Sequence, residues 1–560
     1  MGLDLDEVTR DLVTRSGSER AALGQASAEP ERREDVSARL SGTRFTRELR
    51  DFQRRDLSRL LALPNAANFS VPGAGKTTVT LALYEAERHA GRVQRLLVVA
   101  PLSAFEAWTT EAALCFEDEP PVIQAYSGGA ISPAIEIVLT NYHRLASPES
   151  YSALAKWVTS KPTHIVLDEA HRAKRGWSGE WGRACLSLSY LAARRDVLTG
   201  TPAPQGFKDL EALFDFAWPS QARTILPDDL FLRGQSDLAG DKVAAAIAPL
   251  FVRTTKHDLN LPKVTFSVQP IPLTGVQKEI YSALCHDYAG ELNLTRREEM
   301  DFARMGQVVM YLLEAASNPQ LLAAGSSEFD PPEFRHPPIE VQADSRLREL
   351  VSRYALYETP PKFLALANIV RANADQGRKT LVWTNFVKNI STLEKMLSRY
   401  KPATVHGGVP SRVTSPNAGR LREDEIARFR DRASGCMVLL ANPAAMSEGI
   451  SLHRECQDAV YVDRTFNAGQ YLQSLDRIHR LGLEPHQSPT VTFLETVGTV
   501  DEVVNRRIKE KASRLGQILD DPAVEEMALP DEEDYGSPFD NQGDIAALLE
   551  HLRNAGDEAR

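Results

Sequence analysis

Short apolar runs rich in Val, Ile and Leu alternate with stretches of helical periodicity along most of this 560-residue chain. RLLVVAP, IEIVLT, THIVLDEA and DVLTGTP lie within residues 46–215, and KTLVWTNF, CMVLLANP and TVTFLET lie within residues 360–515. Continuous apolar runs of this length are typical of parallel strands that are buried on both faces. Residues 205–355 show mainly amphipathic helical patterns. The pattern therefore predicts an α/β protein with two parallel-sheet lobes and a helical insertion between them.

The same pattern divides the chain into five segments. Residues 1–45 are polar with weak periodicity, and we expect a loose helix or a disordered arm there. Residues 46–275 are predicted to form the first lobe with a short helical protrusion, and residues 276–355 a second protrusion and linker. Residues 356–515 are predicted to form the second lobe, and residues 516–560 an acidic tail.

The net charge of −11 argues against a nucleic-acid-binding protein until its position along the chain is considered. Residues 520–560 contain thirteen Asp and Glu and two Arg, which accounts for the whole −11 and leaves residues 1–519 neutral. A neutral body can still carry a basic channel. For the tail, two interpretations stay open: a solvated segment without a role, or a polyanion that competes with DNA phosphates.

The cysteines and the apolar runs also limit the class of protein. The five cysteines are widely spread with no C-x-x-C pair, which argues against a disulfide framework and against a zinc ribbon. No apolar run approaches the length of a membrane span, and the acidic start MGLDLDEVTRD is unlike a secretory signal. These features predict a cytoplasmic protein with no membrane partner.

A glycine-containing loop, Ser70-Val-Pro-Gly-Ala-Gly-Lys-Thr77, is the first candidate site. Its glycines allow the backbone to turn so that N–H groups face a phosphate, while Lys76 binds the β/γ-phosphates and the Thr77 hydroxyl holds Mg²⁺. Ser70 replaces the first glycine of the general pattern, so a simple glycine-rich turn stays open for this loop alone. The predicted ATP-binding residues here are Gly73, Ala74, Gly75, Lys76, Thr77 and Thr78.

An apolar strand that ends in adjacent carboxylates strengthens the prediction of a nucleotide site. In Thr163-His-Ile-Val-Leu-Asp-Glu-Ala-His171, Asp168 at the strand tip can reach the Mg²⁺ shell and Glu169 can polarise an attacking water. Asp-Glu pairs usually lie on solvated faces, but this pair ends a buried strand downstream of the loop. Both parts would lie at the carboxyl ends of parallel strands, where α/β sheets bind ligands. ATP and Mg²⁺ are therefore the predicted cofactors.

Between residues 46 and 515 the motifs resemble, in form and order, the Swi/Snf-type branch of the helicase-like superfamily two. Asp168-Glu-Ala-His171 has the form of its DEAH box. Three further segments are similar to its third motif, its sixth motif and an Arg-Lys segment of the branch: Val197-Leu-Thr-Gly-Thr-Pro202, Gln473-Ser-Leu-Asp-Arg-Ile-His-Arg-Leu-Gly482 and Phe251-Val-Arg-Thr-Thr-Lys256. The chain is identified as a compact member with RecA-like lobes, and its Arg- and Ala-rich composition indicates a bacterium.

The resemblance implies roles for further residues. Arg477 and Arg480 lie three apart on one helical face, and an arginine of this motif reaches the γ-phosphate from the second lobe and acts in catalysis with Lys76 and Glu169. Gln53, in Leu49-Arg-Asp-Phe-Gln53, and Gly449 are implied to contact ATP. The residues implied to couple the ATP site to DNA are Pro101, Ser103, His171, Thr199, Thr201 and Gln473.

The resemblance implies a DNA-stimulated ATPase that translocates on double-stranded DNA without separating its strands. Two alternatives stay open: a strand-separating DEAH-type DNA or RNA helicase, and an ATP-dependent remodeller of a protein partner such as RNA polymerase. Compact bacterial proteins of this type also suggest a foreign-DNA (antiviral) defence or restriction-type system. In that hypothesis a nuclease, a methyltransferase or another subunit acts in trans.

Overall fold

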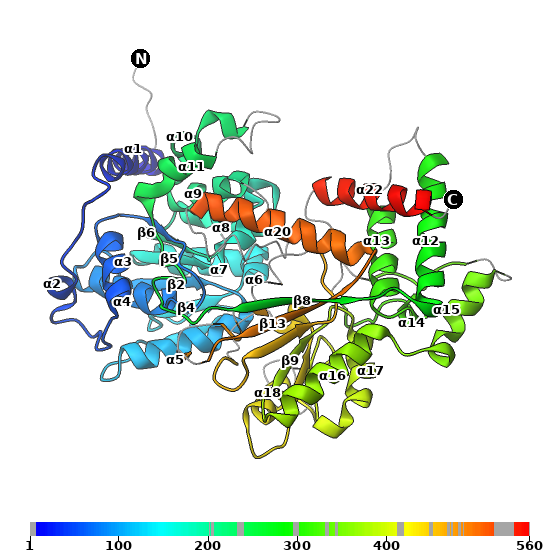
Figure 1. Ribbon diagram of the computed structural model, residues 1–560. Helices are drawn as coiled ribbons and strands as arrows, with labels where there is room; N and C mark the ends of the chain where they lie inside the picture. The colour runs from blue at the N-terminus through cyan, green and yellow to red at the C-terminus, as the bar shows by residue number, and fades with distance from the viewer. Residues whose placement is uncertain are drawn as a thin grey trace. The chain divides into compact units, whose positions relative to one another are not determined.

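The computed structural model describes residues 7–200, 202, 207–231, 240–294, 302–330, 335–341, 345–410, 419–446, 452–466, 471, 474, 475, 477–479, 483, 484, 487–519 and 542–558. The chain divides into two compact units: the first contains Met1–Asn260 together with Arg514–Glu525, and the second contains Leu261–Ser513 together with Glu526–Arg560. In each unit, helices pack around one parallel β-sheet (Figure 1). Within the described ranges, every helix is too short or too polar to cross a membrane.

The first unit contains a seven-stranded sheet in which every pairing is parallel, in the order β3-β4-β2-β5-β6-β1-β7. Its central strands are almost completely buried, which explains the apolar runs in β2 and β5, whereas β6 is buried although it begins with Arg194, Arg195 and Asp196. The strands are β1 Ala66–Asn68, β2 Arg95–Val99, β3 Ile123–Ala125, β4 Ile137–Thr140, β5 Thr163–Asp168, β6 Arg194–Leu198 and β7 Phe251–Val252.

Helices connect and cover these strands. The α-helices of the first unit are α1 Glu7–Ala28, α2 Val36–Leu40, α3 Asp51–Leu61, α4 Lys76–His89, α5 Phe105–Cys115, α6 Tyr142–Ala146, α7 Pro148–Thr159, α8 Glu180–Ser189, α9 Leu210–Ala217, α10 Ala222–Ile225 and α11 Gly240–Ile247. The 3₁₀ turns are η1 Leu102–Ala104, η2 Ala170–Ala173, η3 Gly176–Ser178, η4 Phe207–Asp209, η5 Asp228–Phe231 and η7 Ala248–Leu250.

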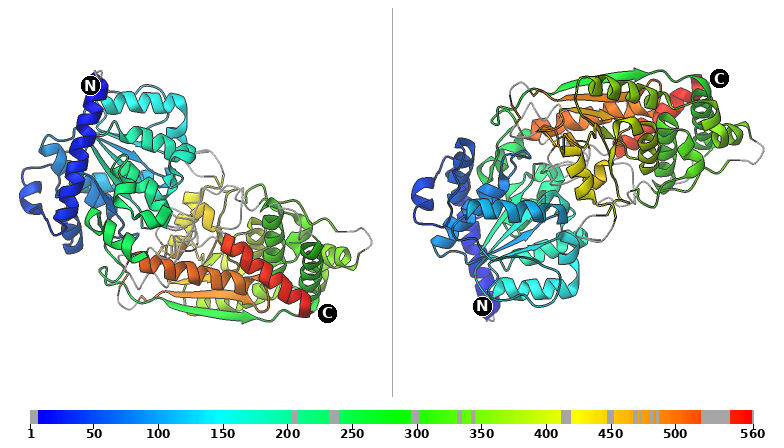
Figure 2. Two further views of the ribbon diagram at one scale, coloured as in Figure 1. Left: turned by 90° about the horizontal axis from the view of Figure 1, so that it is seen from above. Right: turned by 90° about the horizontal axis from the view of Figure 1, so that it is seen from below.

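The polar amino-terminal arm contains helix α1, which packs against the first unit (Figure 2). Leu23 is buried on its inner side, and Glu19 forms an ion pair of 2.5 Å with Arg195 of β6. Arg59 of α3 donates to the carbonyl of Glu29 at the end of the helix. A helix with weak periodicity is therefore fixed by a few long-range contacts, which its local sequence does not reveal.

The second unit contains a six-stranded sheet, again with only parallel pairings, in the order β10-β11-β9-β12-β13-β8. Strand β8 precedes residue 275, where the sequence places the end of the first lobe, yet it pairs with β13 along its whole length. β8 lies at the edge of the sheet, and its residues are mostly exposed and alternate in polarity. Its place in the second unit therefore depends on its long-range pairing. The strands are β8 Thr265–Ile271, β9 Thr380–Trp383, β10 Ala403–Val405, β11 Val438–Ala441, β12 Asp458–Tyr461 and β13 Thr490–Thr496.

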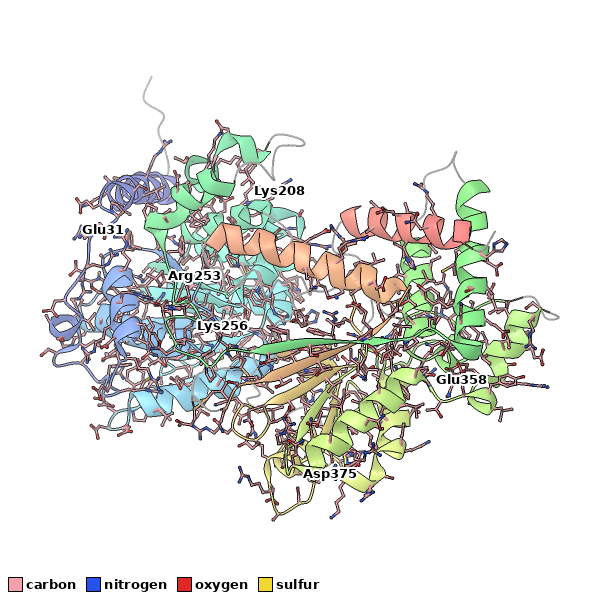
Figure 3. All side chains as sticks on the ribbon, viewed as in Figure 1. Glu31, Lys208, Arg253, Lys256, Glu358 and Asp375 are labelled. Carbon is pink, nitrogen blue, oxygen red and sulfur yellow. The ribbon has the colours of Figure 1, made fainter. Side chains whose placement is uncertain are left out.

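The helices of the second unit include those predicted between the lobes. Glu358 accepts the backbone N–H of Gln277 at 2.8 Å and so caps the first of them, α12 (Figure 3). The bounds are α12 Gly275–Leu294, α13 Phe302–Ser317, α14 Gln320–Ala324, α15 Arg346–Tyr357, α16 Pro361–Asp375, α17 Val387–Met396, α18 Arg422–Arg430, α20 Val500–Leu519, α22 Gln542–Glu558, η9 Ser398–Tyr400 and η10 Pro443–Met446.

Part of the acidic tail is a packed helix. In α22, Leu548 and Leu552 are fully buried, and the helix lies against α12 (Figure 1). The Tyr281 hydroxyl and His551 Nε2 are 2.9 Å apart, and Arg507 donates to the buried Asp544 carboxylate at 2.8 Å. For this helix, the interpretation as a solvated segment is therefore wrong. Its two leucines form an apolar face, which the net negative charge of this segment does not reveal.

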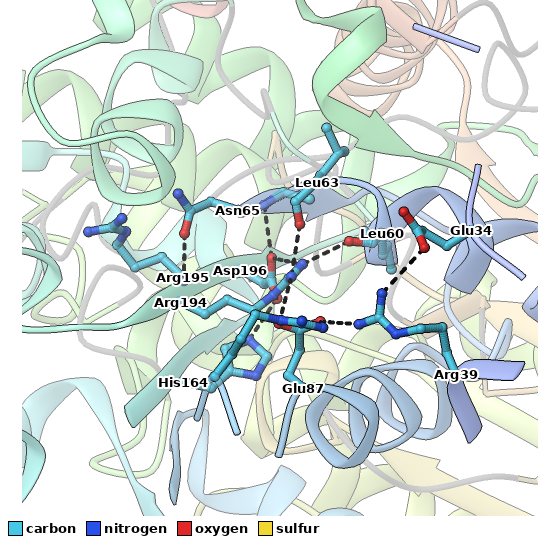
Figure 4. Close-up of polar contacts among 12 residues, drawn as sticks. Glu34, Arg39, Leu60, Leu63, Asn65, Glu87, His164, Arg194, Arg195 and Asp196 are labelled. Atoms are coloured by element: carbon cyan, nitrogen blue, oxygen red, sulfur yellow. Dashed lines mark hydrogen bonds and ion pairs between the residues drawn. The ribbon is translucent and has the colours of Figure 1, made fainter. Parts of the chain in front are cut away.

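A buried ionic network joins β5, β6 and α3 at the amino ends of the strands (Figure 4). The Asp196 carboxylate accepts from Arg194 Nε at 2.8 Å, lies 2.6 Å from His164 Nε2, and accepts the backbone N–H of Ala66 at 2.8 Å. Burial alone raises the pKa of Asp196, but the Arg194 guanidinium and His164 outweigh it and hold that pKa below its usual range. The network therefore keeps a buried carboxylate ionised.

We expect Asp196→Ala to lower the free energy of unfolding of the first unit by about 3–5 kcal/mol, because Arg194 would lose its buried counter-charge. Chemical unfolding followed by fluorescence measures the effect. Glu31→Ala is the control, since Glu31 pairs with Arg33 at an exposed 3.8 Å contact.

The pH dependence has a definite sign. Because the folded pKa of Asp196 is depressed, its stabilisation is complete above its unfolded pKa of about 3.9 and is lost as the pH falls towards the folded value. Asp196→Ala should therefore flatten part of the acid dependence of stability. A loss no larger than that of Glu31→Ala would contradict the prediction.

Candidate nucleotide-binding site

The predicted phosphate loop connects β1 to helix α4. Gly73 and Gly75 have φ angles of +87° and +78°, which L side chains rarely adopt, and Gly75 caps the amino end of α4. A Cβ atom at Gly75 would lie 2.3 Å from Gln53 Nε2, so a side chain at this position would displace the end of the Gln53 side chain. The glycines thus turn the chain directly into the start of a 14-residue helix, and the amino end of a helix favours an anion such as a phosphate.

Gln53 of α3 lies directly against this loop, as the sequence predicts for an ATP-contacting residue. Its Nε2 donates to the Ala74 carbonyl at 3.4 Å, and its Oε1 accepts the Arg50 backbone N–H at 3.0 Å. The side chain is buried. The structure therefore brings Gln53, Ala74 and Gly75 together. The contact of Gln53 with a nucleotide stays a prediction.

The side chains that follow the glycines differ in where they point. Lys76 Nζ donates to the Ser70 carbonyl at 2.9 Å, so its ammonium lies over the loop, and Thr77 is half-buried at the start of α4. The Thr78 hydroxyl instead donates to the Glu111 carboxylate on α5. Lys76 and Thr77 therefore fit a polyphosphate with Mg²⁺, while Thr78 can offer only its backbone. Glu111 is not predicted from the sequence, because no local pattern connects α5 to this loop.

Ser70, which replaces the first glycine of the general loop pattern, has a structural use. Its hydroxyl donates to Asp56 Oδ2 at 3.2 Å and accepts the Thr254 backbone N–H at 2.9 Å. Thr254 also donates to Asp56 at 2.6 Å, and its neighbours Arg253 and Lys256 follow β7 (Figure 3). The Phe251–Lys256 segment is thereby joined to the base of the loop.

The predicted acidic pair lies at the same edge of the sheet as the loop. The loops after β5, β6 and β1 are adjacent because these strands are neighbours and parallel. Asp168 Oδ2 accepts the indole N–H of Trp108 at 2.8 Å, and Oδ1 accepts the Glu169 backbone N–H at 3.1 Å. The Tyr142 hydroxyl donates to the Asp168 carbonyl at 2.8 Å. Neither Trp108 nor Tyr142 was predicted as a site residue.

Glu169 has a φ angle of +52°, which is unusual for a residue other than glycine. Its carboxylate is 26% exposed and lies 3.5 Å from His171 Nδ1, which is also 3.1 Å from the Thr199 hydroxyl. Burial, followed by nearby cations that include Lys76, lowers the pKa of His171 well below its usual value. A neutral imidazole therefore lies between the acidic strand end and the third motif, where a coupling residue is predicted.

The loop after β6 completes this edge. The Thr199 backbone N–H donates to the Asn68 carbonyl at 3.1 Å, and a Cβ atom at Gly200 would lie 2.9 Å from Pro72 Cδ. The third motif is thus packed against the phosphate loop without room for a side chain. Pro101 lies at the end of β2, beside β5, and Ser103 follows in η1, although its side chain is outside the described part.

The second unit contains Arg477, whose carbonyl accepts the Leu452 N–H at 2.8 Å and whose side chain is buried. A polar cluster lies at the carboxyl ends of β9 and β12. Its centre is Asp463, which accepts from Thr384 at 2.6 Å and from the Ser317 hydroxyl at 3.2 Å. Burial raises the pKa of Asp463. Four predicted site residues lie outside the described residues: Thr201, Gly449, Gln473 and Arg480.

The chain has the architecture of two-lobed RecA-like proteins. It contains two parallel α/β units, and the first carries a glycine-containing loop and an acidic pair at one edge of its sheet. The SNF2-related domain matches residues 70–321, and the helicase conserved C-terminal domain matches residues 361–482. The chain belongs to the SNF2-related family of helicase-like proteins, which confirms the expectation from the sequence.

Relatives of known name agree with this assignment. SWI/SNF-related matrix-associated actin-dependent regulator of chromatin subfamily A member 1 of Mus musculus is 24% identical over 84% of this chain and 43% of its own length. Chromodomain-helicase-DNA-binding protein 8 of Danio rerio is 26% identical over 81% of this chain and 18% of its own length. The chain thus spans less than half of these relatives.

The solved structure of the Sulfolobus solfataricus SWI2/SNF2 ATPase core in complex with dsDNA is 20% identical, with a TM-score of 0.37. The match covers 85% of this chain and 94% of that one.

Proposed function

We propose that this protein hydrolyses ATP and uses the energy to translocate along double-stranded DNA. The observation that carries the proposal is one edge of the first sheet. The loop with its glycines and Lys76 follows β1, the Asp168–Glu169 pair follows β5, and only β6 lies between these two strands. In an SNF2-related chain this arrangement supports a site for Mg²⁺ and ATP. The named relatives support DNA as the partner, since one of them is called a DNA-binding protein.

The residues present would divide the chemistry among them. The backbone N–H groups of residues 73–78 and Lys76 would bind the phosphates, and Thr77 with Asp168 would hold Mg²⁺. When bound, Mg²⁺ neutralises charge that develops on the phosphate oxygens. Glu169 would orient the attacking water and take its proton as the new P–O bond forms and the bond to the β-phosphate oxygen breaks.

The remaining predicted residues would link hydrolysis to movement. Arg477 and Arg480 of the second unit would stabilise the γ-phosphate charge only when the two units close on it. His171 would connect Glu169 to Thr199, since its ring lies within reach of both side chains. Ser103 and Gln473 would contact DNA phosphates, which carry no sequence information, so activity should depend little on base sequence. Pro101 is buried after β2 and has no N–H to donate, so it would shape this turn and not bind a phosphate itself.

Duplex DNA should stimulate the ATPase, and the protein should displace the third strand of a triplex while a forked duplex stays paired. Translocation along a backbone displaces a third strand, whereas strand separation also needs an element that splits the fork. ATPase assays with and without duplex, and gels of triplex and fork substrates, measure these activities, with Lys76→Ala as the inactive control. Efficient fork unwinding without triplex displacement would favour the strand-separating helicase. ATP turnover that does not change when DNA is added would favour remodelling of a protein partner.

A finer proposal is that this protein drives a cytoplasmic bacterial system of foreign-DNA defence, with a nuclease or methyltransferase as a separate subunit. Its support is the family together with the Arg- and Ala-rich composition. Neighbouring genes that encode such subunits, and loss of protection against phage when Glu169 is replaced with glutamine, are the expected results. Unchanged protection would contradict it.

A further inference from the structure

Helix α5 contacts both halves of the nucleotide site. Trp108 donates its indole N–H to Asp168 Oδ2 at 2.8 Å, and Glu111 accepts the Thr78 hydroxyl at the start of α4. These two side chains are three residues apart, so they project from one face of the helix. One helix therefore touches the predicted metal-binding carboxylate and the phosphate-loop helix at the same time.

Trp108, in the first turn of α5, is buried, but the helix follows directly on an exposed turn of the chain. Trp108 is 1% exposed, whereas Leu102 in η1, immediately before the helix, is 61% exposed. The far end is fixed, because the Cys115 carbonyl accepts the Thr46 N–H at 2.9 Å and Arg47 pairs with Glu111 at 2.5 Å. The helix thus follows an exposed turn, where Ser103 is predicted to contact DNA, and makes a buried contact with the site; Pro101, before this turn, is itself buried.

We propose that α5 couples DNA binding at residues 102–104 to nucleotide binding, with Trp108 as the residue that positions Asp168 and Glu111 as the one that positions α4. This inference rests on the proposed function. A displacement of η1 by a DNA strand tilts α5 about its fixed far end, and both contacts respond together. Because binding free energies are reciprocal, nucleotide binding must then change the affinity for DNA by the same factor.

Trp108→Phe tests the first contact, because it keeps an aromatic ring and removes the N–H donor. Trp157→Phe is the matched control: its indole N–H is buried and has no partner among the described residues, so the same atoms are lost without a hydrogen bond. Binding of a slowly hydrolysed ATP analogue is measured by calorimetry as a function of Mg²⁺, with and without duplex DNA. DNA affinity is measured with and without the analogue.

In the wild type we expect DNA and the analogue to strengthen each other's binding. Trp108→Phe should weaken Mg²⁺-dependent binding about tenfold, the factor that one hydrogen bond to a charged group contributes, and should abolish the coupling. Analogue binding without Mg²⁺ should stay unchanged, which a general packing defect would not allow. Trp157→Phe should behave as the wild type.

Glu111→Ala tests the second contact independently and should also reduce the coupling, while Arg47→Ala, which leaves the Thr78 contact in place, should not. Unchanged coupling in Trp108→Phe or Glu111→Ala, beside a coupled wild type, would overturn this inference alone. An equal loss in Trp157→Phe would overturn it as well. A wild type in which DNA and nucleotide bind independently would overturn this inference, whereas the proposed function would fail only if ATP turnover were also independent of DNA.

Discussion

Glu169→Gln is expected to lower the ATP turnover number by about 10²- to 10⁴-fold, the usual contribution of a general base. Glutamine has the shape of glutamate but cannot take the proton of the attacking water. It should also keep the φ angle of +52° at about the same cost, so the backbone of the strand end should not change. Steady-state kinetics and equilibrium binding of ATP measure the two effects separately, and binding should persist.

The control is Glu180→Gln, since Glu180 is exposed in the first turn of α8 and has no predicted role in the site. The same loss of charge on the surface should leave turnover unchanged. Near-wild-type turnover in Glu169→Gln would show that another group activates the water. In that case the +52° backbone angle at this residue would have no catalytic meaning.

Arg480→Ala is expected to lower kcat by about 10³-fold or more, as for other arginines that stabilise charge on a transferred phosphoryl group. The residues just before it are well anchored: Arg477 is buried, and His479 Nε2 lies 2.9 Å from the Pro262 carbonyl. Because the charge develops mainly in the transition state, ATP affinity should change little.

Kinetic constants and analogue affinity are compared with those of Arg454→Ala, which removes an exposed arginine from the same unit. That control should retain wild-type kcat. If Arg480→Ala instead lost affinity at unchanged kcat, Arg480 would contact the ground state only. Its role as the arginine of the sixth motif would then be wrong.

The sequence by itself determined the two α/β units and their family. Buried parallel strands leave a local signal, since β2 and β5 contain continuous apolar runs, and the comparisons confirm the family that the motifs indicated. The phosphate loop and the acidic pair could be placed at one edge because parallel strands end together. The catalytic roles of Lys76, Glu169 and the arginines stay predictions.

Only the tertiary structure decided which distant residues support that edge. Trp108 and Asp168 are 60 residues apart, and the indole N–H that joins them has no local pattern. Strand β8 alternates and is exposed, so its place depends on pairing with β13, and α22 is fixed by leucines that pack on α12. Periodicity shows which face of an element is apolar. The partner of that face, or of a single polar group, is set by long-range packing that no short stretch of sequence encodes.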